Sequence, residues 1–210
     1  MELQSYRVFG SGSDRASNYS IAKAIDRAVD AGCDLINLSL GGGPLDLALA
    51  AAISDARSRG SLVIAAAGND DRSPVSYPAS DQLAIAVSAM GRTGAFPRGS
   101  TESGNVSTPH GTDKKNFVAA FTNIGSQIDL TGPGVGIIST VPGGYAVMSG
   151  TSMACPAVTA CAAAILGQRV DILNLQRDNA RSESMAQALY SAARKLGFGA
   201  EYEGQGLPRM

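Results

Sequence analysis

A serine within a run of small residues is the first candidate for chemistry in this chain. Its segment is Gly150-Thr151-Ser152-Met153-Ala154-Cys155-Pro156, and it opens a small, apolar stretch over residues 152–167 that predicts a helix buried on every side. A serine nucleophile is favoured at a helix start, because free backbone N–H groups and the helix dipole stabilise an oxyanion there. Pro156 is compatible with the first helical turn. The alternative is a Thr-Ser helix cap beside packed alanines.

An asparagine that follows a predicted buried strand is the second candidate. Leu62–Ala67 is a continuous apolar run, typical of a parallel strand buried on both faces, and Gly68-Asn69 follows it directly. The sites of α/β proteins lie at the carboxyl ends of such strands. The Asn69 side chain could donate an N–H group to a developing oxyanion. It could instead be a turn residue that tolerates a left-handed backbone.

The elements that must position these two residues alternate between strands and helices. This pattern predicts an α/β fold with a mostly parallel sheet. The predicted strands are Tyr6–Phe9, Leu35–Leu40, Leu62–Ala67, Leu83–Ala89 and Gln127–Leu130. The first predicted helix begins at a cap formed by Ser17 or Asn18 and ends at Gly32. Three further helices are predicted over about 45–59, 152–167 and 183–195.

The chain shows one predicted domain and one predicted insertion. Residues 91–116 are polar, rich in Gly, Ser, Thr and Pro, and without periodicity, so we expect a surface insertion there. No internal repeat and no linker divides the sequence. Residues 1–210 are therefore expected to form a single domain.

Composition limits the classes of function. With 210 residues, 44% of them hydrophobic, the chain has the size of one domain with a sizeable core. A formal net charge of −1 gives no reason to expect nucleic acid or an anionic membrane as a partner. Apolar runs such as Leu83–Met90 are too short to span a bilayer, and Met1–Gly10 contains no signal peptide. The compartment is not indicated by the sequence.

The two candidate segments belong to an ordered series of motifs that resembles the subtilases, the subtilisin family of serine endopeptidases. The series is Ile36-Asn37-Leu38-Ser39-Leu40-Gly41-Gly42, Ala66-Ala67-Gly68-Asn69, Ser76-Tyr77-Pro78-Ala79, Asp129-Leu130-Thr131-Gly132-Pro133-Gly134, Gly150-Thr151-Ser152-Met153-Ala154 and Gly204-Gln205-Gly206-Leu207. It covers nearly the whole chain. The resemblance implies a three-layer subtilisin-like fold and hydrolysis of peptide bonds.

The resemblance also implies roles for single residues. Ser152 would be the nucleophile, and Asn69 would lie in the oxyanion hole. The implied substrate-binding residues are Ser39, Leu40 and Gly41 in the strand that pairs with substrate backbone, Gly68 beside the S1 pocket, and Tyr77 and Pro78 in the loop on the far side of that pocket. The implied partner is a peptide or protein substrate.

No cofactor is expected to be required. Subtilases commonly bind structural calcium, but the loops here contain no acidic cluster of the Asp-x-Asp kind that would support a calcium site. The three cysteines, Cys33, Cys155 and Cys161, lack the spacing of metal ligands and are expected to be buried, reduced thiols. We therefore assign no metal ligand.

The chain departs from the subtilase pattern in the catalytic triad, where the motifs of the Asp and the His are absent. The family's Asp lies in an Asp-Ser/Thr-Gly motif and its His in a His-Gly-Thr-His segment, and neither motif occurs here. The single histidine, His110, falls in the polar segment, where we expect a solvated loop residue. The chain thus resembles the C-terminal two-thirds of a subtilase domain without its N-terminal strands. Alone, it is expected to hydrolyse peptides negligibly, because a serine hydroxyl without a base is a poor nucleophile.

A missing strand has a structural consequence as well. In subtilases the Asp-bearing strand lies between the strands equivalent to Tyr6–Phe9 and Leu35–Leu40. Its absence predicts an unpaired apolar edge that promotes association, unless a separate N-terminal segment carrying Asp and His fills the slot.

Two further functions are compatible with the sequence. The first is a non-catalytic, protease-like module that binds extended peptides along Ser39-Leu40-Gly41 by strand addition. The second is phosphate binding at Gly41-Gly42-Gly43. It is the weaker alternative, since neither Gly-x-Gly-x-x-Gly nor a following Gly-Lys-Ser/Thr is present.

Overall fold

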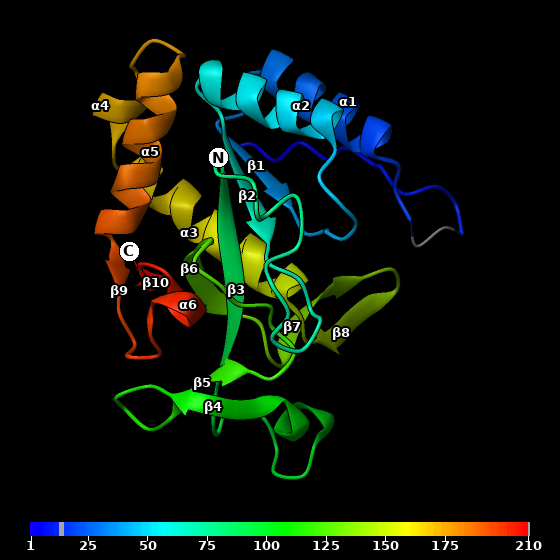
Figure 1. Ribbon diagram of the computed structural model, residues 1–210, viewed down its shortest axis with the longest axis vertical. Coiled ribbons are helices and arrows are strands. Elements are labelled where there is room, and N and C mark those ends of the chain that lie inside the picture. The colour runs from blue at the N-terminus through cyan, green and yellow to red at the C-terminus, as the bar shows by residue number, and fades with distance from the viewer. Residues whose placement is uncertain (13–14, 210) are drawn as a thin grey trace.

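A central sheet lies between two layers of helices in this computed structural model, which describes residues 1–12 and 15–209 (Figure 1). The helices are α1 (Asn18–Asp30), α2 (Leu47–Ser58), the 3₁₀ helix η1 (Thr101–Asn105), α3 (Thr151–Gly167), α4 (Val170–Leu173), α5 (Asn179–Ser191) and α6 (Ala200–Glu203). The strands are β1 (Leu35–Leu38), β2 (Leu62–Ala66), β3 (Ala84–Arg92), β4 (Val106–His110), β5 (Asn116–Ala119), β6 (Ile128–Pro133), β7 (Ile137–Val141), β8 (Gly144–Met148), β9 (Ala193–Arg194) and β10 (Leu207–Pro208).

The main sheet is mostly parallel, which confirms the predicted fold class. Strands β1, β2, β3 and β6 are parallel neighbours, and the antiparallel strands β5 and β4 extend the sheet from the end of β3. Because the parallel strands share one direction, their carboxyl ends meet at one edge of the sheet. The segments that follow β1 and β2 are therefore brought together at this edge.

Alternate residues of β2 face opposite helical layers. Leu62, Ile64 and Ala66 pack in one core cluster with α3 and α5, whereas Val63 and Ala65 pack in another with α1 and α2. All five residues of this strand are buried. This is the burial expected of a continuous apolar run in the middle of a parallel sheet.

Helix α3 packs closely on β6 through small residues. A side chain at Gly132 would collide with the Ala154 backbone, and the Gly150 N–H donates to Gly134 O over 2.8 Å. The prediction that this helix is buried on every side is wrong, because Pro156 is exposed and no described element covers that side. Hydropathy alone did not distinguish a helix covered on one face from one covered on all.

Residues Tyr6–Phe9 do not form the predicted strand. Their burial alternates as in a strand, since Tyr6 and Val8 pack partly against the α1–α2 cluster while Arg7 and Phe9 are exposed. A strand also needs a neighbouring backbone as hydrogen-bond partner, and none of the described strands pairs with this segment. Strand β1 is accordingly an edge strand whose one described neighbour is β2.

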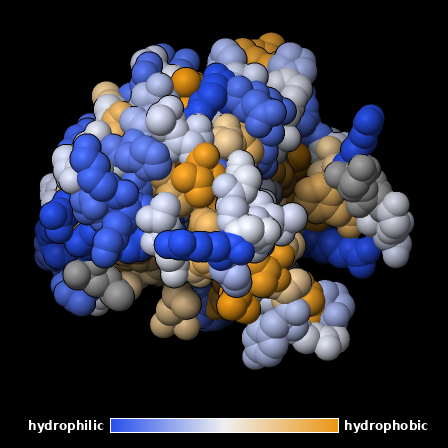
Figure 2. All heavy atoms as spheres, turned by 90° about the horizontal axis from the view of Figure 1, so that it is seen from below, coloured by the Kyte–Doolittle hydropathy of each residue, from blue (hydrophilic) through white to orange (hydrophobic). Residues whose placement is uncertain are grey.

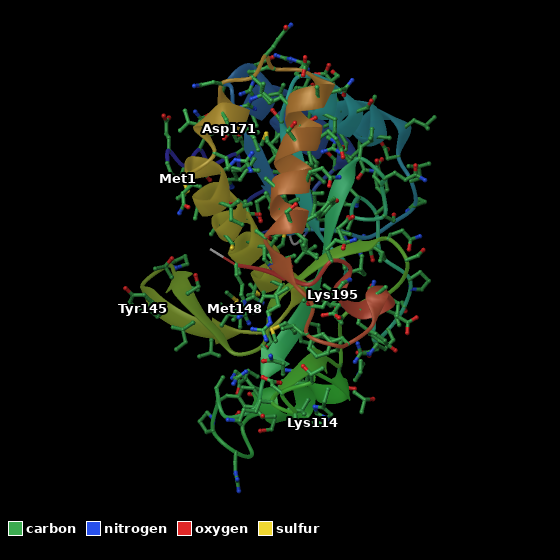
Figure 3. All side chains as sticks on the ribbon, turned by 90° about the vertical axis from the view of Figure 1, so that its left-hand side faces the viewer. Met1, Lys114, Tyr145, Met148, Asp171 and Lys195 are labelled. Carbon is green, nitrogen blue, oxygen red and sulfur yellow. The ribbon has the colours of Figure 1, made fainter. Side chains whose placement is uncertain are left out.

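Two features near the carboxyl edge of the sheet were not predicted. Within the polar segment 91–116, residues Val106–His110 form β4, so His110 is an exposed strand residue and not a loop residue. Strands β7 and β8 form a hairpin that extends from the body of the molecule and carries Tyr145 and Met148 (Figure 1, Figure 3). Figure 2 views this end of the molecule and shows hydrophobic surface among hydrophilic areas.

The cysteines are free thiols, but they are not all buried. Cys155 is fully buried, and burial raises the pKa of its thiol to about 12. Cys33, in the turn before β1, and Cys161, in α3, are only half-buried, which corrects the expectation for these two. Across residues 1–12 and 15–209, no helix combines the length and apolar character needed to cross a bilayer, and no His, Cys, Asp and Glu side chains gather as a metal-binding group.

Candidate active site

Ser152 lies at the start of α3, as predicted. Thr151 is the first residue of this helix, and Gly150 precedes it as the cap, with its carbonyl accepting the Met153 and Ala154 N–H groups at 3.1 and 3.3 Å. The Ser152 side chain is half-buried, and its Oγ donates to Ser39 O over 3.2 Å. The candidate nucleophile therefore touches the segment that follows β1.

Asn69 is attached to the same helix start through its carboxamide oxygen. Its Oδ1 accepts the Thr151 N–H over 2.8 Å and the Thr151 Oγ1–H over 3.0 Å. Because Oδ1 is occupied in this way, the Nδ2 group is directed to the other side of the carboxamide. Among the described residues, Asn69 Nδ2 has no hydrogen-bond acceptor, and the Asn69 residue is exposed.

Two unpaired N–H donors are thus present at the α3 terminus. The Ser152 N–H is in the first helical turn, where N–H groups have no intrahelical acceptor, and Asn69 Nδ2 is the second donor. Both donors lie in the positive field of the helix N-terminus. The arrangement can stabilise negative charge on an oxygen bound next to Ser152.

The implied substrate-binding segments converge on this site. The Gly42 N–H donates to Tyr77 O over 2.9 Å, and a side chain at Gly41 would approach the same carbonyl. On the other side of the loop, the Ser76 N–H donates to Ala67 O over 2.8 Å, next to Gly68. The structure therefore brings the segments 39–42, 67–69 and 76–78 into contact.

The individual residues of these segments differ in what they present to solvent. Gly41 is exposed, and Ser39, Leu40 and Gly68 are half-buried. Both backbone groups of Gly68 are already bonded, its N–H to Thr151 Oγ1 and its carbonyl to the Asn123 N–H. The Tyr77 ring is buried against the α1–α2 cluster, and Pro78 is buried too. Burial, with nearby Asp81 and Asp46, raises the pKa of Tyr77 to about 12. Tyr77 therefore reaches the site through its backbone carbonyl and not through its phenol.

No base accompanies the serine. Within the described parts of the chain, neither a histidine nor a carboxylate hydrogen-bonds to Ser152 Oγ. His110 ends β4 in the antiparallel extension of the sheet, where its Cα pairs with that of Phe117. Among the described residues, the Ser39 carbonyl is therefore the acceptor of the Ser152 hydroxyl, beside the two free N–H donors.

A family model described as the Subtilase family matches residues 1–207. The chain belongs to the subtilase family. Subtilisin Savinase from Lederbergia lenta is 37% identical over 180 residues, which are 85% of this chain and 58% of that protein. Subtilisin NAT from Bacillus subtilis subsp. natto is 37% identical over 191 residues, which are 88% of this chain and 44% of that protein.

Solved structures show the same relationship. Sphericase superposes with a TM-score of 0.73 at 27% identity, covering 97% of this chain and 66% of that one. The self-cleaved protease domain of PatA superposes with a TM-score of 0.72 at 28% identity, covering 96% and 68%. This subtilase chain spans about half the length of the two subtilisins.

The glycine-rich turn of this subtilase is poorly suited to phosphate. The helix that follows Gly41-Gly42-Gly43 begins at Leu47, and the Asp46 carboxylate caps it by accepting the Leu49 N–H over 2.9 Å. A carboxylate at the helix N-terminus would repel a phosphate group. The structure therefore disfavours the phosphate-binding alternative.

Two residues of the site were not singled out by the sequence. Thr151 belongs to the serine motif, but its role as the double donor to Asn69 Oδ1 became visible only in the structure. Asn123, in the turn after β5, is fully buried and bonds to Asp70, next to Asn69. Asparagine is common in turns, so its position between two predicted strands gave no signal of this contact.

Proposed function

We propose that this chain supplies the nucleophile, the oxyanion hole and the substrate strand of a subtilisin-like serine endopeptidase. Ser152 Oγ would attack the scissile carbonyl, and Asn69 Nδ2 with the Ser152 N–H would stabilise the resulting oxyanion. The observation that carries this proposal is the double hydrogen bond from Thr151 to Asn69 Oδ1, which leaves Nδ2 available beside the serine.

The bound substrate would lie along the segment after β1. An extended peptide can pair with accessible backbone by hydrogen bonds, and Gly41 in this segment is exposed. The Ser39 carbonyl, which accepts the Ser152 hydroxyl here, is one acceptor on this path. The implied substrates are therefore extended stretches of peptides or proteins.

The chain by itself would hydrolyse peptides very slowly. The proton of Ser152 Oγ is held by a backbone carbonyl, which cannot act as a general base at neutral pH. Loss of the histidine from a triad of this kind lowers kcat about a million-fold. A segment carrying the family's Asp and His is the partner that would complete the site, and the longer relatives and the unpaired β1 edge support this proposal.

Turnover of fluorogenic peptides tests the proposal. We expect no hydrolysis by the purified chain above that of Ser152→Ala. Measurable, Ser152-dependent turnover would show that a base is present, and would overturn the proposed dependence on a further segment.

Peptide binding without catalysis is the second candidate, and the unpaired edge of β1 favours it. Binding of a labelled extended peptide, followed by fluorescence anisotropy, separates the two functions. A binding module would keep its affinity in Ser152→Ala and would form no covalent adduct with a serine-directed reagent. An endopeptidase site would react with that reagent once a base is supplied.

A further inference from the structure

Asn123 lies behind the loop that carries Asn69, and its side chain is fully buried. The preceding residue, Thr122, fixes this turn to β3 by accepting the Ala89 N–H at Oγ1 over 3.0 Å. A buried carboxamide is costly unless its donors and its acceptor are bonded. The partners of the Asn123 carboxamide therefore indicate what this residue holds in place.

Asn123 binds the peptide groups on both sides of Asn69. Its backbone N–H donates to Gly68 O over 3.0 Å, and its Oδ1 accepts the Asp70 N–H over 2.7 Å. Its Nδ2 donates to Asp70 Oδ2 over 2.9 Å and lies 3.0 Å from Ser76 Oγ. With both neighbours fixed to one buried side chain and its backbone, the backbone of Asn69 has little freedom to rotate.

The neighbouring backbone continues this attachment. The Asp71 N–H donates to Phe121 O over 3.1 Å, and the Ile124 N–H donates to Ser73 O over 3.0 Å. The loop after β2 is thus joined along its length to residues 121–124. Of residues 121–124, as described in the structure, Asn123 is the one whose side chain bonds to Asp70.

We propose that Asn123 is a positioning residue for the oxyanion-hole donor Asn69, which rests on the proposed function of that donor. Asn123 fixes the backbone of Asn69, and Thr151 fixes its carboxamide oxygen. Oxyanion donors act only when they are held in place before the charge develops. Loss of the Asn123 carboxamide would let the loop move and would misdirect Asn69 Nδ2.

Nuclear magnetic resonance of the chain tests this without requiring turnover. The reporters are the Asn69 side-chain amide signals and the solvent exchange rate of the Thr151 N–H, which donates to Asn69 Oδ1. In Asn123→Ala we expect the Thr151 N–H to exchange about five- to tenfold faster. The Asn69 amide signals should move toward those of a solvated asparagine, while the amides of β2 and β3 stay protected.

A second buried asparagine provides the matched control. Asn116 is 9% exposed and accepts Arg92 Nη1 over 3.0 Å on β5, away from the loop. Asn116→Ala should leave both reporters unchanged. Equal changes in the two variants would overturn the proposal, as would unchanged reporters in Asn123→Ala.

The isosteric variant Asn123→Asp adds a pH profile. This profile tests whether Asn123 positions Asn69 even if Asn123→Ala does not fold. It would place a second carboxylate against Asp70 Oδ2, at the position now occupied by Nδ2. Two adjacent carboxylates cannot easily both ionise, so acidification should let them share a proton and restore the wild-type reporters. The exchange of Thr151, compared with wild type at each pH, should therefore recover as the pH falls. Reporters that stay unaltered at neutral pH would contradict the proposal.

Exchanging the two side chains completes the test. In Asp70→Asn/Asn123→Asp an amide again faces a carboxylate, although the hydrogen bond from Asn123 Nδ2 to Pro74 O over 3.1 Å is lost. We therefore expect the reporters at neutral pH to lie closer to wild type than in Asn123→Asp alone. Failure of this rescue in a folded protein would overturn the proposed role of the pair. Because no readout depends on hydrolysis, a chain that proves to lack protease chemistry would still report whether Asn123 positions Asn69.

Discussion

The proposed nucleophile Ser152 lies at a helix start with no histidine or carboxylate bonded to it in the described parts of the chain. Its hydroxyl donates to the Ser39 carbonyl, where a subtilase in action would present the proton to a base. The two oxyanion donors beside it need no base, since one is a backbone N–H and the other is the Asn69 amide. Under the proposed function, the described residues supply the groups for charge stabilisation but not the base for proton transfer.

The positions of Ser152 at a helix start and of Asn69 after a buried strand could be predicted from the sequence, because both follow from local patterns in the chain. The serine opens a stretch that predicts a helix, and the asparagine directly follows a run that predicts a buried strand. Asn123 and the inward direction of the Tyr77 ring could not be predicted in this way. Their partners, Asp70 for one and the α1–α2 cluster for the other, are set by tertiary packing.

Glu203 gives a test at the scale of one residue. Its carboxylate is buried and accepts the N–H groups of Leu196, Gly197 and Phe198 at 2.6, 3.1 and 3.1 Å. In Glu203→Gln an amide N–H faces at least one of these donors, so the free energy of unfolding should fall by about 2–3 kcal/mol. Urea unfolding measures this change. The exposed Glu201→Gln is the control, and equal effects of the two variants would refute the explanation.

At the scale of elements, the parallel core was the most predictable part of the fold. Strands β1, β2, β3 and β6 lie within about three residues of their predicted bounds, because each is a short apolar run ended by turn residues. The predicted strand at Tyr6–Phe9 does not form, because no described strand pairs with it. Strand β4 was missed because its segment Val106–His110 is mostly polar. The β7–β8 hairpin was missed because its apolar residues are largely exposed and do not follow the burial pattern of a core strand.

Asp129 links β6 to two other elements and gives a prediction for pH dependence. Its Oδ2 accepts the Ala86 N–H of β3 over 2.8 Å, and its Oδ1 accepts the Tyr190 Oη–H of α5 over 3.0 Å. Burial raises the pKa of Asp129 above its ordinary value of 3.8, against the opposing effect of these hydrogen bonds. As the pH rises, Asp129 therefore loses its proton at a lower pH in the unfolded chain than in the folded chain. The stability that the protonated group contributes is complete below that ordinary value and is lost as the pH rises through the raised pKa.

The variant Asp129→Asn should remove this loss. Urea unfolding over a pH series should show the variant gaining stability relative to wild type as the pH rises from about 4 toward neutrality. Asp113→Asn is a control of opposite sign, because N–H groups of Asn116 and Lys115 lower the pKa of Asp113 to about 2. The contribution of Asp113 is present above 3.8 and is lost as the pH falls toward about 2. A constant difference between Asp129→Asn and wild type would refute the assignment.

At the scale of the molecule, apolar surface remains open at the end that carries the active site. The register of the hairpin pairs Ile138 with Val147 and Thr140 with Tyr145, so these four residues share one face. Ile138, Val147 and Tyr145 are 71%, 52% and 77% exposed. Together with the unpaired edge of β1, this face favours association with another chain.

We therefore expect the purified chain to self-associate, and Ile138→Thr/Tyr145→Thr to associate less. Threonine keeps the preference for a strand while removing apolar surface. Sedimentation velocity at several protein concentrations measures the change. Leu175→Thr removes an exposed leucine elsewhere and should leave association unaltered. A wild-type chain that stays monomeric throughout the series would contradict this expectation.

Labelling with a fluorophosphonate tests most directly whether Ser152 lies in an oxyanion hole without a base. The chain, shown by circular dichroism to be folded, would be treated with the reagent beside Ser152→Ala, and adducts would be located by mass spectrometry. We predict no adduct at Ser152, because its hydroxyl is not activated. An adduct confined to Ser152 and absent from the variant would contradict this account and would show that the chain itself provides a base, with His110 as the first residue to substitute.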